Sequence, residues 1–190
     1  FFFLSFGFLV RPFLFSPQYP SFVFFFSPPA TMAFTAGYWV LAALRPAAMI
    51  FVGCDMVYSG TGNPHFYGKG SADPLRKDIT LRNLEAKSAR LMLHASGQGC
   101  ACVRAPGGES RLVFPAMDLK DIGRIDLPRM HANPSAFDRA QGFEDTLGYF
   151  VESGRYWDSS PAYSTERLDE LDQLWISAGN SARAADQPAP

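Results

Sequence analysis

The stretch from Ala47 to Tyr67, AAMIFVGCDMVYSGTGNPHFY, decides the fold that the sequence predicts. Its apolar run at 49–52 has no polar alternation, which is typical of a strand buried on both faces of a parallel sheet. A loop rich in Gly, Asn and Pro follows this strand. Because ligands of such sheets bind beyond the carboxyl ends of the strands, we expect the functional site in the loop from Cys54 to Tyr67.

Length, charge and cysteine content limit the kind of protein. The 190 residues suit one domain, long enough to bury a core. A net charge of -1 and a pI near 6.3 give no electrostatic reason to expect a nucleic-acid partner. The three cysteines, Cys54, Cys100 and Cys102, favour a reducing, cytoplasmic compartment. We interpret Cys100 and Cys102 as buried structural thiols and expect no metal site, since no second pair or histidine cluster accompanies them.

The first 29 residues have an unusual composition. They read FFFLSFGFLVRPFLFSPQYPSFVFFFSPP and hold most of the phenylalanine in the chain. They lack the basic start and the small-residue cleavage site of a signal peptide. Arg11 and several prolines interrupt the run well short of the ~20 apolar residues that a membrane span needs. We interpret the segment as part of a chain that begins inside a larger protein, with Phe clusters that are edge strands or poorly folded sequence.

Two helices and a second strand are predicted around the apolar run. A helix from Ala30 should end at about Leu44, because Pro46 cannot continue it. A second helix, from Ile79 to about Ser96, is predicted with Asp78 as its cap and with a stop at the glycines that follow. A short buried strand, Cys100 to Val103, comes next. The order strand, loop, helix, strand predicts a right-handed parallel crossover. On the second helix, we expect the charged side chains to face solvent: Arg82, Glu85 and Arg90.

The C-terminal part is predicted to be helical. Ser135 is expected to cap a helix that ends at Gly154, and Ser164 opens a last helix to about Ser177. The polar tail from Gly179 is expected to be disordered. The predicted organisation is an atypical segment at 1–29, an α/β core at 30–116, a helical region at 117–178 and a tail at 179–190.

Three side chains of the loop are candidates for catalysis. His65 is interpreted either as a general base that accepts a proton from an attacking hydroxyl or as an ordinary surface histidine. Tyr58 and Tyr67 either donate hydrogen bonds to a phosphate leaving group or pack under the loop. Asp55 either orients a ribose hydroxyl or caps the loop backbone. Several enzyme classes are excluded, because the sequence contains no GxGxxG, GxxxxGK[ST], GxSxG, HExxH or CxxC pattern.

Five segments together carry a family resemblance. In order they are ATMAFTAGYWVLAAL, MIFVGCDMVYSG, a histidine-bearing loop, DITLRNLEAKSARL, and CACV followed by ESRLVFP. This order resembles the C-terminal half of the bacterial family 42 sialyltransferases and the related MptE-like and motility-accessory-factor domains. The resemblance covers Ala30 to Pro115. In those families the histidine directly precedes the Asp-Ile helix, whereas here about a dozen residues separate His65 from Asp78.

The resemblance implies a Rossmann-like fold and a metal-independent transferase that uses a CMP-activated nonulosonic acid as donor, with no further cofactor. It implies that His65 is the general base and that Tyr58 and Tyr67 assist the departing phosphate. Gly53 and Asp55 match the strand-end signature and are the implied nucleotide-binding residues.

We therefore expect an α/β protein with a Rossmann-like parallel sheet fragment and a helical C-terminal region. The expected function is sialyltransferase-like transfer from a CMP-sugar to a hydroxyl of a cell-surface glycan. It would take place in the cytoplasm, with peripheral contact at the inner membrane. Two alternatives stay open: another nucleotide-dependent transferase, of methyl or pyrophosphoryl groups, and a truncated fragment that is not catalytic and packs against a partner.

Overall fold

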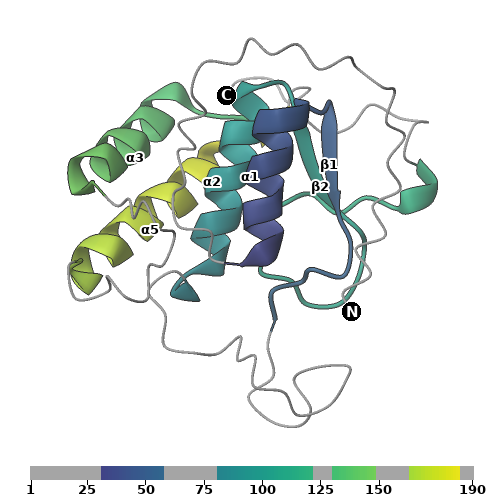
Figure 1. The fold of residues 1–190 in the computed structure, drawn as a ribbon, viewed down its shortest axis with the longest axis horizontal. Coiled ribbons are helices and arrows are strands. Elements are labelled where there is room, and N and C mark those ends of the chain that lie inside the picture. The colour runs from purple at the N-terminus through teal and green to yellow at the C-terminus, as the bar shows by residue number, and fades with distance from the viewer. Residues whose placement is uncertain (1–30, 58–80, 122–129, 149–162, 185–190) are drawn as a thin grey trace, which may run out of the picture.

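The structure is a computed structural model of the chain, and it describes residues 31–57, 81–121, 130–148 and 163–184. Two parallel strands form one small sheet, two antiparallel strands form another, and four long helices supply most of the described residues (Figure 1). The elements are α1 Met32–Leu44, β1 Ala48–Phe51, α2 Leu84–Gly97, β2 Ala101–Arg104, the 3-10 helix η2 Leu119–Asp121, β3 Met130–His131, α3 Pro134–Leu147, α5 Thr165–Ser181 and β4 Arg183–Ala184.

The predicted parallel pairing of the two apolar strands is confirmed. Ala48 lies opposite Ala101 and Phe51 lies opposite Arg104, and α2 lies between the two strands in the chain. The ladder begins with a hydrogen bond from the N–H of Ala101 to the carbonyl of Ala47 and ends with one from the N–H of Ala105 to Phe51. The described residues thus form a mixed α/β structure with more helix than strand.

β1 differs from the prediction, because it is not buried on both faces. Met49 is its one buried residue, and Val52, which follows it, is 54% exposed. β2, by contrast, buries Ala101, Cys102 and Val103. The reason is their position in the sheet. β2 lies between β1 and the segment around Ala116, which forms a parallel bridge with Arg104, whereas in the described part of the chain β1 pairs only with β2.

Capping residues explain where the first two helices begin and end. The hydroxyl of Thr31 accepts a hydrogen bond from the N–H of Phe34, and α1 ends at Leu44, as predicted, with Arg45 in the left-handed region before Pro46. α2 begins later than predicted, at Leu84. The side chain of Asn83 caps it by accepting a hydrogen bond from the N–H of Ala86 at 3.1 Å. The cap that we expected, Asp78, lies outside the described residues.

The last two helices also differ from their predicted limits. α3 is capped by Asn133 rather than Ser135, and it ends at Leu147 because Gly148 adopts a left-handed conformation, φ 56°. α5 is capped by Ser164, as predicted. It then continues through Gly179 to Ser181, and β4 follows it, so the tail does not begin where the sequence predicted.

α2 lies at the centre of the helical packing and contacts α1, α5 and β2. Figure 1 shows α1 and α2 next to each other beside the two strands, with α5 and α3 farther from the sheet. The prediction that Arg90 faces solvent is wrong: its side chain is 3% exposed. It donates hydrogen bonds to both carboxylate oxygens of Glu144, each at 2.8 Å, and to the hydroxyl of Tyr38 at 2.7 Å. The indole of Trp175 donates to the same carboxylate at 2.9 Å.

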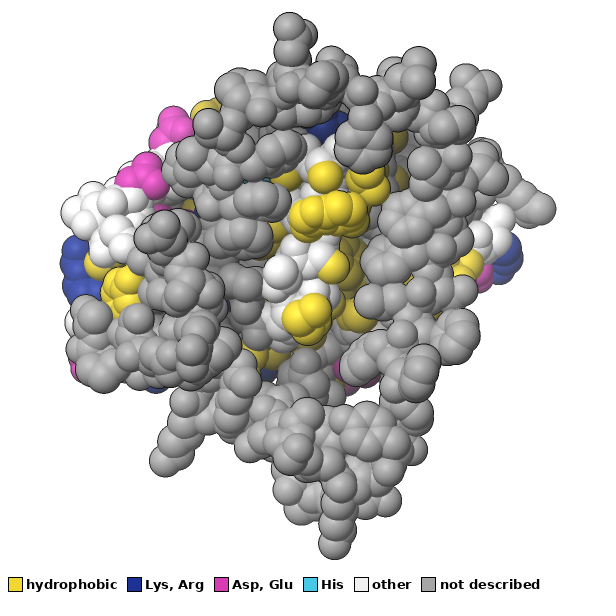
Figure 2. Space-filling model, viewed as in Figure 1, with side chains coloured by type: hydrophobic (Ala, Val, Ile, Leu, Met, Phe, Trp, Pro, Cys, Tyr) yellow, Lys and Arg dark blue, Asp and Glu magenta, His cyan; other side chains and the backbone are white. Residues whose placement is uncertain are grey.

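The outer surface of α1 is apolar. Figure 2 shows apolar side chains gathered near the middle of the molecule's face, over α1. Met32 is 82% exposed, Trp39 47% and Leu44 45%. None of the helices among the described residues is both long and apolar enough to cross a membrane.

Candidate functional site

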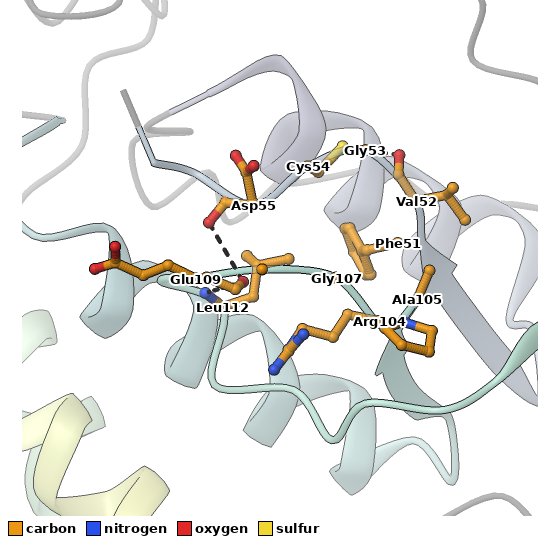
Figure 3. Close-up of a pocket in the computed structure, with 13 residues that line it drawn as sticks. Phe51, Val52, Gly53, Cys54, Asp55, Arg104, Ala105, Gly107, Glu109 and Leu112 are labelled. Carbon is orange, nitrogen blue, oxygen red and sulfur yellow. Dashed lines mark hydrogen bonds between the residues drawn. The ribbon is translucent and has the colours of Figure 1, made fainter. Parts of the chain in front are cut away.

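A hollow of about 190 Å³ lies beyond the carboxyl ends of β1 and β2. This is the edge of the sheet at which the sequence predicted a site. One rim is the chain that leaves β1, and the other is the loop that leaves β2 (Figure 3). The residues that line it are Phe51, Val52, Gly53, Cys54, Asp55, Arg104, Ala105, Pro106, Gly107, Gly108, Glu109, Ser110 and Leu112.

A change of direction after β1 forms the first rim. Gly53 has a φ of 68° and Met56 a φ of 60°, so the chain enters the left-handed region twice within a few residues. No described atom lies within 4 Å of the place that a Cβ on Gly53 would occupy, so the backbone conformation is what favours glycine here. The turn sets the main chain of Asp55 toward the second rim.

Hydrogen bonds join the two rims. The carbonyl of Asp55 accepts one from the N–H of Arg111 at 2.8 Å and one from the hydroxyl of Ser110 at 3.3 Å. The guanidinium of Arg111 donates to both carboxylate oxygens of Glu85, at 3.0 and 2.9 Å, which fastens the loop to the first turn of α2. The hydrogen bond from Arg111 lowers the pKa of the Glu85 carboxyl, so this pair stays ionised at neutral pH. These contacts fix the two rims of the hollow relative to each other and to α2.

Arg104 is the basic residue that lines this hollow, and it is not among the residues that the sequence predicts for the site. It is the last residue of β2, and its Nε is buried without a hydrogen-bond partner among the described residues. A buried donor without a partner costs about 1–3 kcal/mol. Because this Nε is buried, a ligand in the hollow would meet the outer Nη groups of the guanidinium rather than Nε. The signal in the sequence was a charged residue directly after the buried run CACV.

The two predicted nucleotide-binding residues, Gly53 and Asp55, both line the hollow. One Asp55 oxygen, Oδ1, accepts a hydrogen bond from the N–H of Val57 at 3.1 Å. This contact matches the interpretation of Asp55 as a cap of the loop backbone. In Figure 3 the carbonyl of Asp55 faces Ser110, and its carboxylate points to the opposite side. The carboxylate is exposed, and among the described residues no hydrogen bond of its second oxygen is found.

The three predicted catalytic residues, Tyr58, His65 and Tyr67, lie outside the described residues. Their roles therefore stay predictions. The chain leaves the described part at Val57, directly after the first rim of the hollow.

The cysteines divide between the hollow and the core. Burial raises the pKa of the Cys54 thiol, and the nearby Asp55 carboxylate raises it further, so this thiol is a weak nucleophile at neutral pH. Cys100 and Cys102 are buried, as predicted. A search of the described ranges finds no group of three His, Cys, Asp or Glu side chains placed to hold a metal ion.

Comparison of the chain with family models, with curated proteins and with solved structures finds no match. The chemistry that the hollow can support therefore follows from the residues that line it. They supply one guanidinium, two carboxylates, a hydroxyl and a turn with two adjacent glycines: Arg104, Asp55, Glu109, Ser110, Gly107 and Gly108.

Proposed function

We propose that the hollow beyond β1 and β2 binds the nucleotide of an activated donor, and that the chain is a sialyltransferase-like glycosyltransferase. The observation that carries this proposal is the position of the hollow. Two parallel strands end at it, Gly53 turns the chain around it, and Arg104 supplies a cation. Nucleotides bind at this edge of parallel sheets in many α/β proteins.

The proposed reaction is the transfer of a nonulosonic acid from a CMP-sugar to a hydroxyl of a cell-surface glycan. The acceptor oxygen forms a bond to the anomeric carbon while the bond from that carbon to the CMP phosphate oxygen breaks. His65 takes the proton of the hydroxyl, and the bonding electron pair leaves with the phosphate. Tyr58 and Tyr67 donate hydrogen bonds to that phosphate as it gains charge. Asp55 holds a ribose hydroxyl, and the donor sugar nucleotide is the one small molecule required.

A second candidate keeps the same hollow and changes the transferred group to methyl or pyrophosphoryl. A third candidate is a fragment that is not catalytic and binds a partner. The exposed apolar side chains of α1, Met32, Trp39 and Leu44, favour this third candidate, since such patches mark interaction surfaces. For the leading candidate we propose a cytoplasmic location with peripheral contact at the inner membrane.

Calorimetric titration separates these candidates. We expect CMP to bind and S-adenosylmethionine not to bind. Binding of S-adenosylmethionine without CMP would favour the second candidate, and the absence of any nucleotide binding would favour the third.

Replacement of His65 tests the chemical step. We expect His65→Ala to lower transfer from a CMP-sugar by about 100-fold or more, because the general base is lost. The affinity for CMP should change little, since the base acts on the acceptor. The matched control is His131→Ala, at an exposed position of β3, which should leave both quantities unchanged. Full transfer activity in His65→Ala would show that this histidine is not the base.

A further inference from the structure

We infer that Arg104 binds a phosphate group in the hollow. The inference concerns the same hollow as the proposed function and rests on it for the nucleotide, but it requires neither the sugar nor the base. Arg104 and all the other residues that line the hollow belong to the described part of the chain.

The charge of Arg104 is not neutralised within the described residues. No ion pair of Arg104 is found there, and its buried Nε has no hydrogen-bond partner among them. The two carboxylates that line the hollow do not approach it. Asp55 engages the N–H of Val57, and in Figure 3 Glu109 points away from the Arg104 side chain. The buried Nε is closed to a ligand, whereas the Nη groups are not buried and have no hydrogen-bond partner among the described residues, so an anion that enters the hollow would meet these donors.

The ion pairs of two other arginines show what is unusual about Arg104. Arg111 and Arg90, which are also partly or fully buried, each have a carboxylate held by two hydrogen bonds. Arg104 has the same planar fork of donors, which matches the oxygen atoms of a phosphate. Within the described residues Arg104 lines a hollow and has no carboxylate partner, whereas each of the other two has one.

The backbone of the second rim leaves room for the same anion. No described atom lies within 4 Å of the places that Cβ atoms on Gly107 and Gly108 would occupy. Within the described part of the chain, no hydrogen bond of their N–H groups is found. The second rim is therefore open beside the hollow that Arg104 lines.

The size of the hollow indicates that it encloses only a small group. Its volume of about 190 Å³ is below the ~300 Å³ at which pockets begin to enclose a whole drug-sized ligand. A phosphate group fits within this volume, whereas a complete nucleotide extends beyond it. The chemical class of ligand is therefore a phosphate ester, such as a nucleoside monophosphate, that is held by its phosphate end.

The test compares two ligands that differ only in the phosphate. CMP and cytidine are titrated into the full chain and into the variant Arg104→Gln, which keeps a polar side chain but is shorter and loses the charge. We expect the full chain to bind CMP more tightly than cytidine by about tenfold or more, since hydrogen bonds to charged groups carry this much free energy. Arg104→Gln should remove that preference and leave the affinity for cytidine unchanged. The matched control is Arg139→Gln, an exposed position on α3, which should keep the preference.

The possible results distinguish a failure of the phosphate site from a failure of the proposed function. Equal binding of CMP and cytidine by the full chain overturns the role of Arg104 and leaves the nucleotide site standing. A preference for CMP that survives in Arg104→Gln also overturns it. If neither CMP nor cytidine binds but inorganic phosphate does, and Arg104→Gln abolishes that binding, the phosphate site stands and the nucleotide function fails.

Folding of the variant is checked by its thermal midpoint. If Arg104→Gln does not fold, Arg104→Lys is used, because it keeps the charge and loses the planar fork. Arg104→Lys should weaken CMP binding and leave cytidine binding unchanged. An unaltered affinity for CMP in that variant would overturn the inference.

Discussion

The helical half of the molecule and the strand-end hollow are held together in different ways. Among α2, α3 and α5, buried charges are matched: Arg90 pairs with Glu144, and Lys87 pairs with Asp172 at 2.9 Å. At the hollow, two hydrogen bonds to the carbonyl of Asp55 join the rims, and the half-exposed ion pair of Arg111 with Glu85 fastens the second rim to α2.

The comparison shows where stability and function are separated. A buried ion pair is costly to break, because removal of one partner leaves the other charge without compensation. A half-exposed loop that is held by a few hydrogen bonds loses little when one of them is removed. Substitutions among the helices should therefore lower stability, whereas substitutions at the hollow should change binding. Four predictions test this difference, from the largest expected effect to the smallest.

Glu144→Ala should have the largest effect. It leaves the buried guanidinium of Arg90 without a counter-charge and removes the acceptor of the Trp175 indole. We expect the free energy of unfolding to fall by about 3–5 kcal/mol in urea denaturation. The control is Glu170→Ala, which breaks an exposed pair with Arg167 and should cost less than about 1 kcal/mol. Similar losses in the two variants would contradict the comparison.

Gly179→Ala tests the contact between α5 and α2. A Cβ on Gly179 would lie 2.9 Å from the Cβ of Ala89, so the two helices would have to move apart. We expect a loss of about 1–3 kcal/mol in the same denaturation experiment. Gly142 of α3 is the matched control, because no atom of the described part of the chain lies within 4 Å of its Cβ position. Gly142→Ala should stabilise the protein by about 0.5–1 kcal/mol, and a loss of stability there would refute this explanation.

His94 should make the helical half sensitive to acid. Its ring contacts Tyr38, Phe137 and Trp175, and its Nε2 is buried without a hydrogen-bond partner among the described residues. Burial, and then the nearby charge of Arg90, lower the pKa of His94 to about 3. The unfolded chain, with an ordinary pKa near 6.5, therefore binds a proton first as the pH falls.

Because the pKa of His94 is lower in the folded protein than in the unfolded chain, acid destabilises the fold. The stability that depends on neutral His94 is complete above about pH 6.5 and is lost as the pH falls toward 3, by up to about 1.4 kcal/mol for each pH unit. Denaturation at pH 7 and at pH 5 measures the slope. His94→Gln should flatten it, and His131→Gln, at an exposed position of β3, should not. A slope that is unchanged in His94→Gln would assign the acid sensitivity to other groups.

Asp55→Ala should have the smallest effect on stability. It removes the hydrogen bond from Val57 but leaves the carbonyl of residue 55 in contact with Ser110 and Arg111. We expect a change of less than about 1 kcal/mol in the free energy of unfolding. A loss as large as that of Glu144→Ala would end the distinction between the two regions. Calorimetry with CMP on the same variant tests whether this carboxylate also contacts a ribose.

A helix end, a helix cap and the pairing of two consecutive strands were predicted correctly from the sequence. The end of α1 before Pro46, the cap of α5 at Ser164 and the parallel pairing of β1 with β2 all follow from capping chemistry and from the order of elements. The position of the hollow follows in the same way, since it depends on where two strands end. Gly53 and Asp55 both line this hollow, and their role in nucleotide binding stays a prediction.

Features that depend on distant partners were not predicted. Arg90 was expected in solvent because its partner, Glu144, lies 54 positions along the chain. The exposure of β1 was missed because burial depends on the layers and strands that pack around a strand, and the sequence of a single strand carries no information on these neighbours. Arg104 was missed for a related reason, because a charge at the end of a strand is distinctive only when nothing neutralises it.

The hydrogen bonds of β1 also show which of its two edges faces β2. Ala47 and Phe51 direct their carbonyls to β2, and in a parallel ladder the residues between them alternate. The N–H and carbonyl groups of Ala48 and Ile50 therefore point away from β2. Among the described residues, β2 is bridged on its far side, at Arg104 and Ala116, whereas no described strand pairs with the far side of β1. In the described part of the chain β1 is thus the outer strand, and its carboxyl end borders the hollow.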